Sequence, residues 1–190
     1  VGVGIQGITV PLRDGMTVPT NNNFVAADLD QLTGLKGDAS TKYISTGLIG
    51  TDLAQNDNSI SAHITEVQTA GSYIAGSGEF PDVCNHLLVV GGNYEVRNMS
   101  ATRLPVGAIA TGLFGSSRSV STGYDYIVGG STGSKTLTSA APSTKAYSVF
   151  ASSAALPTDV RLATYHAGPA LNLATLEGLQ DTLITEIAAI

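Results

Sequence analysis

The sequence predicts an all-β protein, a two-sheet antiparallel β-sandwich followed by a C-terminal amphipathic α-helix. Three observations predict this fold. Short segments that alternate polar and apolar residues recur along the chain, and turn-forming residues separate them. Only 13% of the residues are charged and 22 of the 190 are glycine, a composition that favours strands and tight turns over a helical bundle. Residues 172–190 instead repeat apolar side chains at helical spacing.

One globular domain is expected, because no low-complexity linker divides the chain. It is predicted to have three parts: an N-terminal extended arm and first strand at 1–23, the β-sandwich at 24–171, and the helix at 172–190. About ten to twelve strands are expected, more than one flat sheet would hold, so two sheets should pack face to face.

The strands are predicted from period-two patterning. Ile60, Ala62 and Ile64 would share one face of a strand, with polar residues on the other. Gly91 and Gly92 permit the positive φ angles of a hairpin turn inside 86–96. The later alternating segments are 124–128, 147–151 and 160–165.

The segment GGSTGSKT, at 129–136, comes close to a phosphate-binding loop. Ser134 stands where that loop has its last glycine, and no helix pattern follows. We therefore expect a hairpin turn here rather than a nucleotide site.

Asn172 is the predicted N-cap of the last helix, and Pro169 ends the strand before it. An apolar stripe then follows at spacings of three and four: Leu176, Leu179, Leu183, Ile187 and Ile190. Such a stripe has to be covered, either by the chain's own sandwich or by a neighbouring subunit. The first alternative is favoured, because a monomer must also cover the edges of its sheets.

Charge and apolarity exclude two classes of partner. A formal net charge of −6 with nine Lys and Arg argues against nucleic acid, whose binding needs clustered cations. No segment approaches the roughly 20 apolar residues that cross a bilayer, so no membrane insertion is expected. The single cysteine, Cys84, is predicted to be a core residue.

No residue is predicted to be catalytic and no cofactor is expected. Its many serines lie in turn or strand contexts without an assigned base, and its three histidines lie far apart, which favours hydrogen bonding over metal binding. No metal is predicted, but carboxylate oxygens suit calcium, and three aspartates lie close in sequence. These weak calcium candidates are Asp28, Asp30 and Asp38.

Motifs along almost the entire chain resemble one known family. The last strand and the turn into the helix carry 161–163, Tyr165, Gly168 and 170–171. Upstream, further motifs follow in the same order: 10–12, 20–24, 33–38, 41–43 and 111–118. Together they resemble the laminin-G-like, concanavalin A-like jelly-roll modules of bacteriophage and prophage virion proteins, of tail, fibre or head-decoration type.

This resemblance implies a non-enzymatic structural component of a virion that acts by subunit assembly, as a homo-oligomer and with other virion proteins. The alternative is an adhesion module that binds a host surface polysaccharide, and a remote alternative is a glycan-cleaving enzyme. Function does not follow from such a fold alone, because the fold hosts several activities.

Assembly and glycan binding would each use different residues. Assembly would use the apolar ends of the chain: Val1, Val3, Ile5, Ile8, Leu183, Ile187 and Ile190. An equal alternative for the N-terminal arm is an added edge strand on its own sandwich. Glycan stacking would use tyrosines, because the chain has no Trp. The candidates are Tyr73, Tyr94, Tyr124 and Tyr126.

Overall fold

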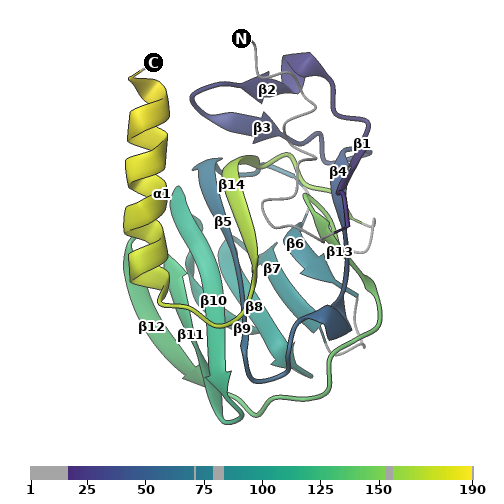
Figure 1. Cartoon of the computed structure of the whole chain (residues 1–190), viewed down its shortest axis with the longest axis vertical. Helices are drawn as coiled ribbons and strands as arrows, with labels where there is room; N and C mark the ends of the chain where they lie inside the picture. Colours follow the sequence, from purple (N-terminus) through teal and green to yellow (C-terminus); the bar gives the residue numbers. More distant parts are fainter. Residues whose placement is uncertain (1–16, 71, 79–83, 153–155, 190) are drawn as a thin grey trace.

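A computed structural model describes residues 17–70, 72–78, 84–152 and 156–189. Within these ranges the chain forms two seven-stranded antiparallel sheets and one C-terminal helix (Figure 1), so the predicted β-sandwich is confirmed. Sheet A has the order β1 (Thr20–Asn22), β4 (Tyr43–Ile49), β13 (Ala146–Val149), β6 (Tyr73–Ser77), β7 (Cys84–Val90), β8 (Asn93–Ser100) and β9 (Leu104–Ala108). Sheet B has the order β12 (Ser131–Thr136), β11 (Gly123–Val128), β10 (Gly112–Val120), β5 (Asn58–Glu66), β14 (Arg161–Gly168), β3 (Gly34–Lys36) and β2 (Leu29–Asp30).

The main core lies between the inner faces of the two sheets. Ile60 and Ile64 of β5 are fully buried there, as the alternating pattern predicted. Phe114 of β10 stacks on Tyr94 of β8, with ring centroids 4.2 Å apart, and so joins the two sheets. Aromatic pairs of this kind add to the free energy already gained by burial.

Buried polar groups also tie the two sheets together. The Arg118 side chain on β10 is fully buried and donates from Nη2 to the Asn98 carbonyl of β8 at 2.9 Å. The same nitrogen donates to the Leu137 carbonyl at 3.0 Å, and the guanidinium lies 5.4 Å from the centre of the Tyr124 ring. The guanidinium charge is therefore buried together with carbonyl acceptors and an aromatic face.

Two predicted hairpins are confirmed. β7 and β8 pair through a turn at Gly91 and Gly92, whose φ angles are +57° and +80°. β11 and β12 pair through a turn at Gly129 and Gly130, with φ angles of +50° and +82°. The segment that comes close to a phosphate loop is thus a strand hairpin.

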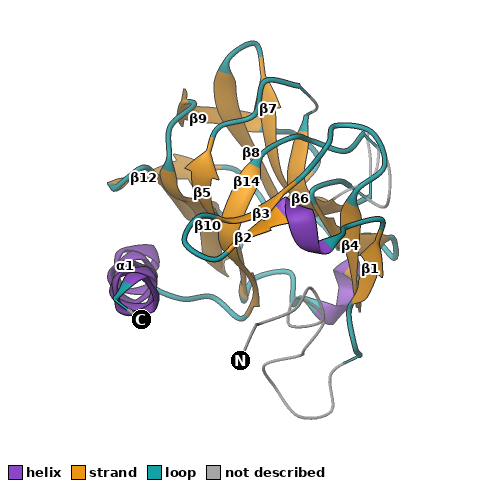
Figure 2. Cartoon of the chain, turned by 90° about the horizontal axis from the view of Figure 1, so that it is seen from above, coloured by secondary structure: helices purple, strands orange, loops and turns teal. Residues whose placement is uncertain are grey.

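Helix α1 (Leu173–Ala188) stands outside the sandwich, against β10 and β11 of sheet B (Figures 1 and 2). The predicted N-cap is confirmed, because the Thr175 N–H donates to Asn172 Oδ1 at 3.0 Å. Leu173 is buried against Leu113 and Ile127, the two apolar residues that the outer face of sheet B offers at this point. The helix is therefore anchored mainly at its first turn.

Only part of the predicted apolar stripe of α1 faces the sheet: Leu176 packs against the cluster of Leu113, Ile127 and Leu173. Among the helix residues whose burial the structure describes, Leu173 and Gln180 are buried, whereas Leu179 is 65% exposed and Leu183 is 47% exposed. The prediction that the chain's own sandwich covers this stripe is therefore wrong for these two leucines. The outer face of sheet B is largely polar, so the helix turns a mixed polar and apolar side toward it.

Both faces of β5 are buried, although the sequence predicted burial on one face only. Ser61 is 1% and His63 9% exposed on the outer face. β5 is the central strand of sheet B, with β10 on one side and β14 on the other, so its outward side chains are flanked by those of both neighbours. Within the part of the chain that the structure describes, no helix has the length and apolarity to cross a membrane.

Candidate functional site

A groove of about 580 Å³ lies between α1 and the outer face of sheet B. The sheet contributes the outward side chains of β5 and two glycine turns, and the helix contributes two carboxylates one turn apart, which therefore project from the same face. The polar and glycine residues that line it are His63, Thr65, Thr111, Gly112, Gly129, Gly130, Glu177 and Asp181.

The charges in this groove are unbalanced. His63 Nδ1 is buried, has no hydrogen-bond partner and lies 3.9 Å from Asp181 Oδ1. The Glu177 carboxylate lies over the β11–β12 turn, because a Cβ built on Gly130 would be 3.9 Å from Glu177 Oε1. Among the described residues, no Lys or Arg lines the groove. The site is thus negative and rich in hydrogen-bond acceptors.

Other buried polar atoms of sheet B and α1 also have no hydrogen-bond partner among the described residues. They are Ser61 Oγ, Thr164 Oγ1 and Gln180 Oε1. The strand register places Thr164 directly opposite His63. Further unpaired buried atoms, such as Tyr147 Oη and Asn85 Oδ1, lie on sheet A, so such atoms are not confined to this layer.

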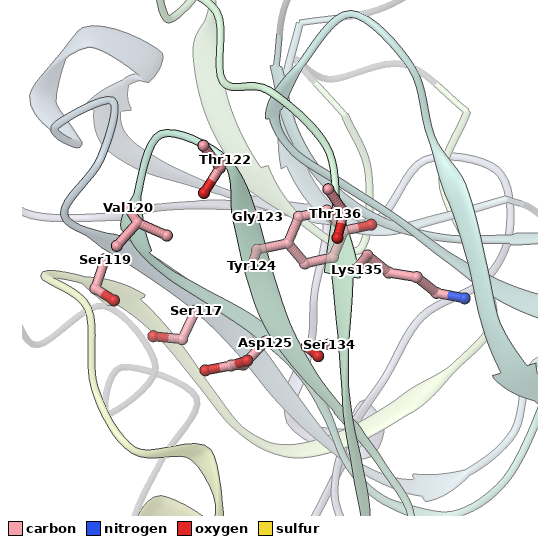
Figure 3. Close-up of a pocket in the computed structure, with 10 residues that line it drawn as sticks. All are labelled: Ser117, Ser119, Val120, Thr122, Gly123, Tyr124, Asp125, Ser134, Lys135 and Thr136. Carbon is pink, nitrogen blue, oxygen red and sulfur yellow. The ribbon is translucent and has the colours of Figure 1, made fainter.

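A second depression, a hollow of about 260 Å³, lies over β10, β11 and β12 (Figure 3). Ser117, Asp125 and Ser134 are cross-strand neighbours and form one polar row. In Figure 3 the Ser117 and Asp125 side chains point to the same side, whereas Lys135 points away. Hydroxyl and carboxylate groups in such a row can bind a ligand rich in hydroxyls.

Three of the four tyrosines predicted to stack on a glycan belong to the interior of the fold. Tyr73 is 8%, Tyr94 0% and Tyr124 3% exposed, so these rings present no open face to a sugar. Tyr126 is half-buried, packs against Gly133 and has Lys135 Nζ 5.6 Å from its ring centre.

The three calcium candidates serve local structure. Asp28 Oδ1 accepts a hydrogen bond from Lys42 Nζ at 2.7 Å, and Asp30 Oδ1 accepts from the Leu32 and Thr33 amides. Burial raises the pKa of Asp38, but the N–H groups of residues 40–42 lower it by more, so its pKa lies well below the usual value. Among the described residues, no three His, Cys, Asp or Glu side chains are placed to hold a metal ion.

Two serine–histidine pairs occur that the sequence did not predict. Ser59 Oγ lies 2.9 Å from His166 Nε2, and Ser152 Oγ lies 2.9 Å from His86 Nε2. Each serine hydroxyl, however, donates to a backbone carbonyl, that of Pro169 for Ser59 and that of Gly78 for Ser152. A nucleophilic serine must give its proton to the base instead, so these pairs are structural.

The predicted assembly residues are only partly within the described chain. Leu183 is exposed on α1, one turn from the exposed Leu179. Val1, Val3, Ile5, Ile8 and Ile190 lie outside the described residues, as does the side chain of Ile187. The alternative of an added edge strand from the arm falls outside them too.

Sequence reasoning missed the groove. The available signal was the spacing of Glu177 and Asp181, which puts two acids on one helical face. The partner surface was not visible, because nothing in the sequence says which strand this face meets.

Comparisons with known proteins support the fold. No protein-family model matches the sequence, and no curated protein matches it either. Among solved structures, the chain is similar to the enzymatically active domain of tailspike protein 2 of bacteriophage CBA120, with a TM-score of 0.53 and 11% sequence identity. The match covers 90% of this chain and 31% of that one. This chain is thus a β-sandwich that distantly resembles part of a phage tailspike.

Proposed function

We propose that this chain is a non-enzymatic structural module of a bacteriophage virion, in a tail, a fibre or a capsid decoration, and that it works by subunit assembly. The likeness to a tailspike domain supports the virion, as does the sequence resemblance to laminin-G-like virion modules. Both arguments rest on resemblance, and resemblance alone does not establish how a protein works. The proposal of subunit assembly therefore has to rest on particular residues.

The observation that carries the proposal is the exposed flank of α1, formed by Leu179 and Leu183. The two leucines are one helical turn apart and adjoin each other on the helix surface. Burying them is favourable by about 25 cal/mol per Å² of apolar area, and the chain's own sandwich does not do so. The α1 helix of an identical copy offers the same leucines, so a self-complementary contact would bury both flanks.

Light scattering over a concentration series tests this proposal. The wild-type chain should have the mass of an oligomer, and the double variant Leu179→Glu, Leu183→Glu should have the mass of a monomer. Val120→Glu is the matched control, because Val120 is also 53% exposed but lies on β10. A wild-type chain that stays monomeric, or a double variant of unchanged mass, would refute assembly through α1.

A second function, adhesion to a host surface glycan, is supported by the polar row in the hollow. Asp125 lies between Ser117 and Ser134 and can accept hydrogen bonds from sugar hydroxyls. A glycan array should then show binding that Asp125→Ala abolishes and that Glu186→Gln, a charge loss on α1, leaves intact. New reducing ends on a bound glycan would favour the remote alternative, a glycan-cleaving enzyme.

A further inference from the structure

We propose that the groove between α1 and sheet B is a binding site for a protonated amine, carried by a small organic ligand such as an amino sugar or a polyamine. This site lies on the sheet side of α1, apart from the exposed leucines and from the hollow. It therefore does not depend on the assembly function proposed above.

The first argument is the state of His63. Its residue is 9% exposed, it lines the groove, and its Nδ1 has no hydrogen-bond partner. Asp181 Oδ1, at 3.9 Å, is too far for a hydrogen bond. A buried, unpaired ring nitrogen in the wall of a groove is a group for which a ligand can provide the partner.

The second argument is the excess of acceptors. Glu177 and Asp181 bring two carboxylates, and neither has a Lys or Arg partner in the groove. The Thr65 hydroxyl donates its proton to the Thr33 carbonyl, so its oxygen can only accept from a ligand. Such a site favours a ligand with many donors, and an ammonium group has three N–H donors and a positive charge.

The third argument is access to the backbone. Gly112, Gly129 and Gly130 form the rim with φ angles of +100°, +50° and +82°, a conformation that other residues rarely adopt. Because they lack side chains, a ligand can approach the chain closely between Glu177 and His63. The volume of the groove is within the range of small-molecule sites.

An organic cation fits the groove better than a metal ion. His63, Glu177 and Asp181 do not form a metal-binding group, and no other such group exists in the described ranges. All ligands of a metal ion must converge on one point at short distance. The N–H groups of an organic amine donate over longer distances, so they can bind acceptors that lie further apart.

Isothermal titration of the full chain at pH 7 and low salt tests the site with three probes. Kanamycin is an amino sugar with many hydroxyls, its fully N-acetylated derivative keeps the hydroxyls but loses the charges, and spermidine has charges without hydroxyls. Binding of kanamycin, of spermidine or of both supports the proposal, and the pattern identifies which source of the amine fits. Absence of binding by both amines, or equal binding of the N-acetylated derivative, overturns it.

Variants locate the binding. Glu177→Gln and Asp181→Asn should each weaken amine binding by on the order of tenfold, because each removes one charged acceptor. Glu186→Gln removes the same charge from an exposed position of α1 and should change binding less than about twofold, since exposed charges are screened. Equal losses in all three variants would mean diffuse attraction to an acidic helix, and would overturn the site.

The imidazole provides a readout that does not need a variant. In ¹⁵N NMR spectra of the wild-type chain, the His63 ring nitrogens should shift on saturation with the amine. The His86 ring is buried elsewhere, against Tyr73 of sheet A, and its signals should stay in place. Unchanged His63 signals at saturation would contradict a ligand in this groove.

Discussion

The two faces of sheet B are built on different principles. The inner face is apolar and closely packed, with Ile60, Ile64 and Phe114 fully buried. The outer face is mostly polar, and α1 packs on it at β10 and β11, where Leu173 meets Leu113 and Ile127. The apolar core between the sheets is thus much larger than the cluster under α1, and it should contribute more to the stability of the fold.

The largest expected loss of stability comes from a substitution on the inner face of sheet B. Phe114→Ala should lower the free energy of unfolding by about 3 to 5 kcal/mol, because it removes a buried ring that stacks on Tyr94. Leu173→Ala, in the small outer cluster, should cost roughly 2 kcal/mol or less, since the helix can readjust. Urea unfolding measures both. Equal losses would break the comparison between the two faces.

The next largest effect is a pH dependence of the stability, caused by a second buried histidine, His86. Burial lowers the pKa of His86 from 6.5 to about 4, although its hydrogen bond to the Gly78 carbonyl opposes the shift. Between these values the unfolded chain binds more protons than the folded chain, so stability rises with pH. Neutral His86 thus contributes about 3 kcal/mol to the free energy of unfolding. This contribution is fully present above pH 6.5 and is lost by about pH 4.

Urea unfolding between pH 4.5 and pH 7 checks this slope, and His86→Gln should flatten most of it. Burial also lowers the pKa of His166, so a smaller slope of the same sign should remain. An NMR titration in which His86 gains a proton near pH 6.5 would contradict the prediction.

The smallest expected effect is a stabilisation of helix α1 that leaves the stability of the sandwich almost unchanged. Gly178→Ala should stabilise α1 by about 0.5 to 1 kcal/mol, since alanine favours helix. A Cβ at this position meets nothing within 4 Å. Hydrogen exchange of the α1 amides should slow, while the urea midpoint of the sandwich should hardly move. A parallel increase in both would show that helix and sandwich unfold as one unit.

The sequence predicted what depends on local patterning. Period-two alternation identified the inner face of β5, the glycine pairs identified two hairpins, and Asn172 was correctly predicted to cap α1. These features are set by residues close together in the chain.

The same reasoning was wrong where distant segments meet. The stripe containing Leu179 and Leu183 looked like the packing face of the helix, because apolar spacing shows which residues share a face but not which surface that face meets. The groove depends on Glu177 and Asp181 meeting His63, more than 100 positions earlier in the chain, and Tyr73, Tyr94 and Tyr124 are buried by tertiary packing that no local pattern reveals.

Arg118 has a mechanical consequence. Its guanidinium is a rigid fork of five N–H donors, and its Nε and Nη2 both donate to the Asn98 carbonyl of β8 in the opposite sheet. Sliding one sheet over the other would break both of these bonds at once. Under tension the two layers should therefore resist shear, and α1, anchored mainly at its first turn, should peel away first.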